Sequence, residues 1–133
     1  MLDDLRRGRW EKLVWNIPFN GLGAALDLTT DRLIGSTAGM DLLNRLMREV
    51  VAIAAAEGVQ MPPDLIDRQI THTSTMGAYQ SSMQVDKRQG RALEVEAIFG
   101  EPLRRAARLG VDTPTLRALY DMVRLVDPAA GGE

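Results

Sequence analysis

Hydrophobic residues recur at three- and four-residue intervals along most of the chain, which is the spacing of one face of an α-helix. The clearest case lies between residues 40 and 57, where this spacing continues up to Gly58, a natural helix stop. No segment alternates apolar and polar residues over the length of a half-buried strand. Leu and Ala dominate the apolar residues, and this composition favours helix over sheet. The pattern predicts an all-α fold.

Capping residues and prolines indicate where the other helices begin and end. A first helix is expected over residues 4–25, with a kink near Pro18 because a proline inside a helix removes a backbone donor. A loose stretch is expected over residues 77–90. Further helices are expected over residues 30–34, from the prolines at 62–63 to about 75, and over 91–99, 102–109 and 113–125. The sequence therefore predicts six or seven helices in a single domain spanning residues 1–133.

Composition narrows the class of protein. The chain has 133 residues, of which 45% are hydrophobic and 26% charged, as in an ordinary globular domain. A formal charge of −2 argues against a nucleic-acid partner, and the absence of cysteine together with a single histidine argues against a metal site. The longest apolar run, Val50 to Ala56, is too short for a membrane span, and no secretory signal opens the chain. We expect a cytoplasmic domain.

Several features have a simple structural interpretation. The segment Asn20–Ala25 is similar to part of a dinucleotide fingerprint, but no strand precedes it, so we interpret it as a closely packed helix end. His72 lies in a polar stretch and is expected at the surface. The charge runs at 86–88 and 104–105 are expected to be solvated faces.

Lys12, Asn16 and Asn20 recur at four-residue spacing, which places them on one stripe of the first helix. One amine and two amides beside aromatic and aliphatic neighbours are poorly explained by solvation, because Asn is a mediocre helix former. The same spacing also describes any exposed helix face. From spacing alone, a functional stripe and a solvated face both remain open.

The residues around this stripe carry a resemblance to a known family. Trp10–Leu22 resembles the opening of the C-terminal helical domain of ketopantoate reductases (2-dehydropantoate 2-reductases), and Ser81–Gly100 resembles a later signature of the same family. The two blocks follow in the family's order and at about its separation, and the resemblance covers nearly the whole chain. It implies a helical bundle like the C-terminal domain of ketopantoate reductase and 6-phosphogluconate dehydrogenase-like proteins.

The resemblance implies an NADPH-dependent oxidoreductase of pantothenate biosynthesis that reduces 2-dehydropantoate, a 2-keto acid. Lys12 matches the catalytic lysine that donates a proton to the substrate oxygen. Asn16, Asn20 and Ser82 match residues that hydrogen-bond the substrate, and Glu94 matches a catalytic glutamate at the edge of substrate and cofactor. An ammonium suits this chemistry, because hydride delivery to a ketone builds negative charge on its oxygen.

The resemblance also implies a partner. Family members begin with a Rossmann domain whose glycine-rich turn binds NADPH, whereas this sequence starts almost directly at the first helix of the C-terminal domain. We therefore expect an excised domain, a truncated reading frame or half of a split enzyme, inactive without a Rossmann domain in cis or in trans. Self-association into a homo-oligomer is also expected. The alternatives are the same fold acting on another 2-keto acid, and a non-catalytic helical dimerisation module left by truncation.

Overall fold

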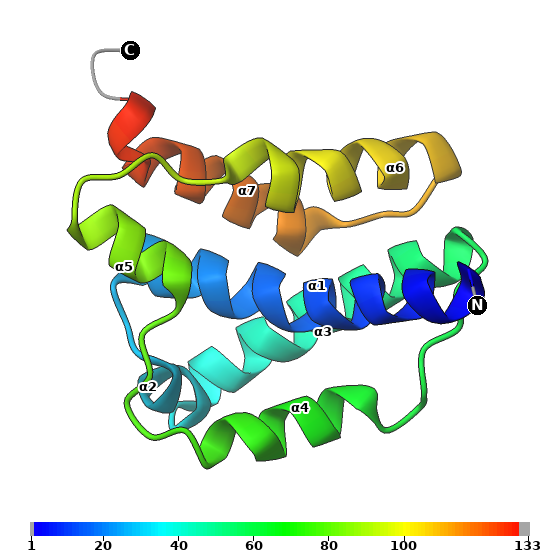
Figure 1. The fold of residues 1–133 in the computed structure, drawn as a ribbon, viewed down its shortest axis with the longest axis horizontal. Coiled ribbons are helices and arrows are strands. Elements are labelled where there is room, and N and C mark those ends of the chain that lie inside the picture. Colours follow the sequence, from blue (N-terminus) through cyan, green and yellow to red (C-terminus); the bar gives the residue numbers. More distant parts are fainter. Residues whose placement is uncertain (1, 131–133) are drawn as a thin grey trace.

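The computed structural model describes residues 2–130, and over these residues the chain forms helices joined by short loops, with no β-strand (Figure 1). The all-α prediction is confirmed. The α-helices are α1 (Leu2–Leu26), α2 (Thr30–Ile34), α3 (Thr37–Ala56), α4 (Leu65–Ser74), α5 (Ser82–Arg88), α6 (Glu101–Leu109) and α7 (Pro114–Val126). A π-helical turn, η1 (Glu96–Gly100), leads into α6, and a 3₁₀ turn, η2 (Pro128–Ala130), follows α7.

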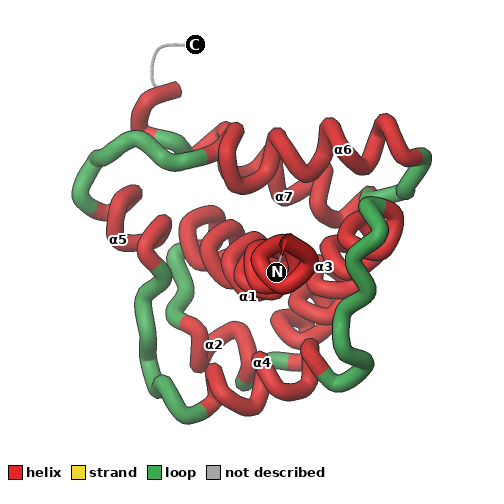
Figure 2. Tube along the Cα trace, turned by 45° about the vertical axis from the view of Figure 1, so that its right-hand side comes forward, coloured by secondary structure: helices red, strands yellow, loops and turns green. Residues whose placement is uncertain are grey.

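Helix α1 lies at the centre of the bundle. Figure 2 looks almost along the axis of α1 from its N-terminus and shows the other helices around it. Helices α3, α5 and α7 pack against it most extensively, and α4 and η1 also contact it. Val14, Ile17 and Phe19 are fully buried within this ring. The first turns of α1 extend beyond it, and Leu2 and Leu5 are exposed there. The second half of α1 therefore forms the core, while its first half is open.

Two expected boundaries differ because a capping residue was not recognised. Helix α3 begins at Thr37 instead of residue 40, because the Ser36 side chain accepts a hydrogen bond from the backbone N–H of Gly39 at 3.3 Å. The stretch expected to be loose contains α5, because Ser81 caps it by accepting from the backbone N–H of Gln84 at 3.3 Å. A short helix with a good cap carries too few residues for its periodicity to be visible.

The helix expected over residues 91–99 is confirmed only in its second half. Residues 91–94 are irregular, and the π-helical turn begins only at Glu96. Leu93 and Val95 are both buried while Glu94 between them is exposed, an alternation that a helix does not give. The backbone N–H of Leu93 donates to Asp127 Oδ1 at 3.0 Å, so a contact with the C-cap residue of α7 holds this irregular segment in place.

Glycines bring helices close together at three positions. A Cβ on Gly21 would lie 2.5 Å from Leu119, and a Cβ on Gly23 would lie 2.8 Å from the Ser81 hydroxyl oxygen. The interpretation of the glycines in α1 as close packing is thus confirmed. A Cβ on Gly39 would overlap the backbone carbonyl of Leu33, so α2 and α3 meet without any intervening side chain.

We predict that Gly39→Ala destabilises the fold by about 1–3 kcal/mol, because the overlap is with backbone that cannot rotate away. Gly8→Ala is the matched control: it also lies inside a helix, has nothing within 4 Å of an added Cβ, and should be neutral or stabilising by up to about 1 kcal/mol. Urea unfolding of both variants measures the difference. Equal stability of the two would contradict this account of the α2–α3 contact.

Candidate functional site

The open half of α1 separates two hollows. The larger, the α1–α4 groove, has a volume of about 1090 Å³ and is lined by α1 together with residues of α4 and the loop after it, among them Gln69, His72, Met76 and Tyr79. The smaller, the α1–α6 hollow, has a volume of about 360 Å³ and is lined by Arg6, Arg9, Trp10, Lys12, Leu13, Asn16, Ala97, Glu101 and Arg105. Arg9, Lys12 and Asn16 line both, so this face of α1 forms a ridge between them.

Lys12 is exposed on this ridge, and within residues 2–130 it forms no hydrogen bond or ion pair. Three arginines line the α1–α6 hollow with it, against a single carboxylate, that of Glu101. A concave surface with this excess of positive charge attracts anions. Arg9 was not singled out from the sequence, although its position three residues before Lys12 places it on the same helix face.

Asn20, in contrast, is only 3% exposed. Its Oδ1 accepts hydrogen bonds from the backbone N–H of Met83 at 3.1 Å and from the hydroxyl of Ser82 at 3.3 Å. The backbone N–H can only donate, so the carboxamide oxygen must face α5. The Asn20 NH₂ group finds no acceptor within residues 2–130, which leaves it as the donor that a ligand could use.

Glu94 is exposed and lines neither of these hollows. It borders a third one, the α7 hollow of about 870 Å³, together with Asp121 and Arg124 of α7. Ala97 borders both this hollow and the α1–α6 hollow, so the two are adjacent. The structure thus groups Lys12 with Asn16 and Asn20 with Ser82, and places Glu94 on the far side of Ala97.

Ion pairs hold the segment that carries Glu94. Asp86 and Arg91 pair at 2.9 Å across the turn between α5 and Glu94. Arg104 also bridges Glu96 at 3.0 Å while its side chain stays 55% exposed, so the solvated face expected at residues 104–105 carries surface ion pairs. Tyr120 donates its hydroxyl to Glu96 at 2.6 Å, and this hydrogen bond, followed by that from Arg104, lowers the pKa of Glu96.

Trp15 and Tyr79 line the α1–α4 groove, with their ring centroids 6.4 Å apart. Trp15 stacks on Phe19 with ring centroids 4.8 Å apart, and its indole N–H donates to Thr73 Oγ1 at 2.8 Å. His72 is exposed, as expected, and lines the same groove. Within the described part of the chain, no three acidic or histidine side chains gather closely enough to hold a metal ion. None of the helices in that part combines the length and apolarity that a membrane crossing requires.

Residues 4–127 match the family described as "Ketopantoate reductase PanE/ApbA C terminal". The chain is 42% identical over 127 residues to a 2-dehydropantoate 2-reductase of Nostoc sp., a match covering 96% of this chain and 40% of that protein. A crystal structure of 2-dehydropantoate 2-reductase from Geobacter metallireducens superposes with a TM-score of 0.88 at 39% identity, covering 91% of this chain and 41% of that one.

A dimeric ketopantoate reductase from Staphylococcus aureus also superposes, with a TM-score of 0.83 at 28% identity over 96% of this chain and 45% of that one. The helical fold of this chain is thus the fold of the C-terminal domain of ketopantoate reductases. The chain belongs to the ketopantoate reductase family, as the domain that carries its C-terminal helices. It spans about two fifths of the length of the relatives it matches.

We predict that Tyr120→Phe raises the pKa of Glu96 toward its ordinary value, because the hydroxyl that stabilises the carboxylate is lost. A lowered folded-state pKa contributes stability above the pKa of the unfolded chain, and this is lost as pH falls through the folded-state pKa. Tyr120→Phe should therefore flatten the stability loss below about pH 4. Carboxyl NMR titration measures the pKa directly. An unshifted Glu96 titration would contradict the assignment.

Proposed function

We propose that this chain is the substrate-binding and catalytic domain of an NADPH-dependent reductase that converts 2-dehydropantoate to pantoate in pantothenate biosynthesis. The observation that carries the proposal is the ridge of α1, where Lys12 has no ion-pair partner within residues 2–130 and shares a helix face with Asn16 and Asn20. Membership of a family named for this reaction supports the proposal.

The proposed chemistry assigns a role to each residue. Reduction of a ketone places negative charge on its oxygen, and the Lys12 ammonium stabilises this charge and donates the proton. Asn16 and the free NH₂ group of Asn20 hydrogen-bond the substrate and orient it, together with the Ser82 hydroxyl. The positive lining of the α1–α6 hollow attracts the carboxylate of a 2-keto acid. NADPH, when bound, supplies the hydride.

We propose that Glu94 contacts both the cofactor and the substrate. It is an exposed carboxylate beside an open hollow and can accept a hydrogen bond from a ribose hydroxyl. Phosphate binding by a dinucleotide domain needs a glycine-rich turn between a strand and a helix, and residues 2–130 contain no strand. We therefore propose that a Rossmann domain, in cis or in trans, holds most of the cofactor.

Self-association is part of the same proposal. A relative from Staphylococcus aureus is described as dimeric. Leu2, Leu5 and Leu125 expose 78%, 65% and 83% of their surface, and large exposed apolar side chains favour contact with another protein surface. A second copy of this chain or the Rossmann domain would cover such surfaces.

The chain by itself should bind NADPH only weakly, because its described residues offer no phosphate-binding turn. Isothermal titration calorimetry measures this affinity. A dissociation constant in the micromolar range would contradict the proposal that another domain holds the cofactor.

The proposed roles can be tested in a fusion enzyme, in which the part of the Nostoc relative that precedes the matched segment is joined to the start of this chain. Lys12→Ala in that enzyme should lower kcat by about 10²–10⁴, or about 3–5 kcal/mol, because the developing alkoxide loses its acid. Asn20→Ala should act mainly through KM, because an orienting hydrogen bond is made in the ground state as well. Steady-state kinetics with 2-dehydropantoate and a melting curve for each variant measure both effects.

Arg108→Ala is the control, because Arg108 is exposed on α6 and lines none of the three hollows. Near-full turnover of Lys12→Ala would refute the proposed role of Lys12. Unfolding of this variant would instead show that the polar stripe of α1 serves stability and not catalysis. Faster turnover of another 2-keto acid would favour the alternative substrate. A folded fusion enzyme without activity on any keto acid would favour a dimerisation module.

A further inference from the structure

Helix α1 ends without the residues that usually stabilise a helix end. Its last turn contains no basic side chain, and Asp27, the next residue after it, has a φ of 56° in the left-handed region. The last carbonyls of a helix lack intrahelical partners and carry the negative end of its dipole. A cation from elsewhere in the chain would therefore stabilise this end.

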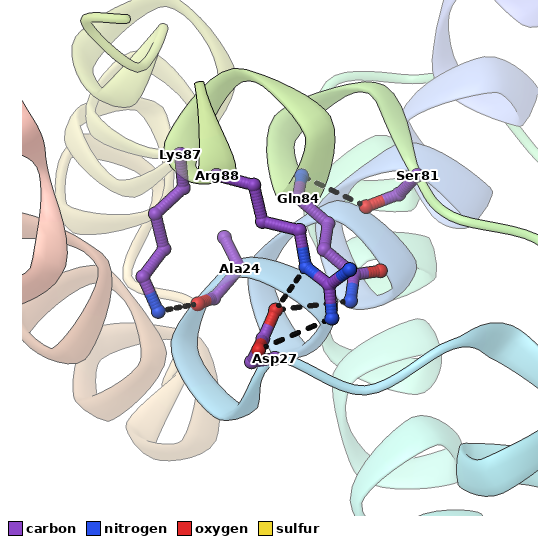
Figure 3. Close-up of polar contacts among 6 residues, drawn as sticks. All are labelled: Ala24, Asp27, Ser81, Gln84, Lys87 and Arg88. Carbon is purple, nitrogen blue, oxygen red and sulfur yellow. Dashed lines mark hydrogen bonds and ion pairs between the residues drawn. The ribbon is translucent and has the colours of Figure 1, made fainter. Parts of the chain in front are cut away.

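Helix α5 supplies that cation, as Figure 3 shows. Lys87 Nζ donates to the backbone carbonyl of Ala24 at 2.8 Å. Arg88 donates to the Asp27 carboxylate from Nε at 2.8 Å and from Nη2 at 3.3 Å, and Gln84 Nε2 donates to Asp27 Oδ1 at 3.2 Å. We call these five residues, Ala24, Asp27, Gln84, Lys87 and Arg88, the α1–α5 clamp.

The same two helices also meet at the start of α5. Met83 N–H and the Ser82 hydroxyl donate to Asn20, one turn before Ala24 on α1. Met83 likewise precedes Lys87 by one turn on α5, so the two pairs of contacts match in spacing. Gly23 lies between them and permits the close approach, since a Cβ there would lie 2.8 Å from Ser81 Oγ.

We propose that Lys87, Arg88 and Asp27 are positioning residues that hold Ser82 against Asn20 and so fix the direction of their hydrogen-bonding groups. The proposal rests on the proposed function in that Asn20 and Ser82 bind the substrate. Helix α5 has only seven residues and is too short to hold its own position. Contacts at both of its ends determine where Ser82 lies relative to α1.

Hydrogen exchange of the Met83 backbone amide tests this in the chain itself, because this N–H donates to Asn20. Lys87→Met and Arg88→Met should each speed its exchange about tenfold, while the amide of Val50 in the core of α3 keeps its rate. Arg117→Met, which removes an exposed arginine paired with Asp121 at 3.9 Å on α7, is the control and should change neither rate. Lys87→Arg should restore the protection of Met83.

An unchanged Met83 rate in both variants overturns the proposal. Equal acceleration of Met83 and Val50 also overturns it, because the clamp would then act on global stability alone. In the fusion enzyme, Lys87→Met should raise KM for 2-dehydropantoate about tenfold while kcat stays within about twofold. If Asn20→Ala raises KM and Lys87→Met does not, the positioning role fails. If the unsubstituted fusion enzyme is inactive, that result counts against the proposed function. The exchange rates of Met83 and Val50 then test by themselves whether the clamp positions Ser82.

Discussion

The enclosure of α1 by the other helices is the constraint on which the rest of the structure depends. Its second half contributes fully buried side chains, such as Val14, Ile17 and Phe19, to the contacts with helices on several sides. Each such side chain contributes about 1.5–3 kcal/mol by leaving water. Within residues 2–130 no other helix has this position, so this part of the chain is organised around a single 25-residue element.

This enclosure divides the polar residues of α1 into two kinds. Lys12 and Asn16 lie where the helix emerges from the bundle, so they remain open to a ligand. Asn20 lies where the helix is covered, and a buried amide without a partner would cost about 1–3 kcal/mol. Helix α5 removes this cost for the amide oxygen by donating to it, and α1 in turn anchors α5. The mutual dependence explains how a seven-residue helix is held in place.

The longer helices were predictable because their periodicity is a local property. The stripe of α3 and the Thr113–Pro114 start of α7 are visible in short windows of sequence, and the structure contains both helices. The predictions failed in segments whose conformation depends on contacts with residues far away in the sequence. The segment that holds Glu94 is irregular, and its Leu93 N–H donates to Asp127, 34 residues away. Helix α5 depends on α1 residues about 60 positions earlier.

The helical class and the placement of Lys12, Asn16 and Asn20 on one face can be read from the residue order alone, because both follow from a period of 3.6 residues. Only the tertiary structure decided which part of that face is open and which is buried. It also decided that Ser82 meets Asn20 and that Glu94 borders a different hollow from Lys12. These relations join residues far apart in the chain, and they arise from packing that no local pattern encodes.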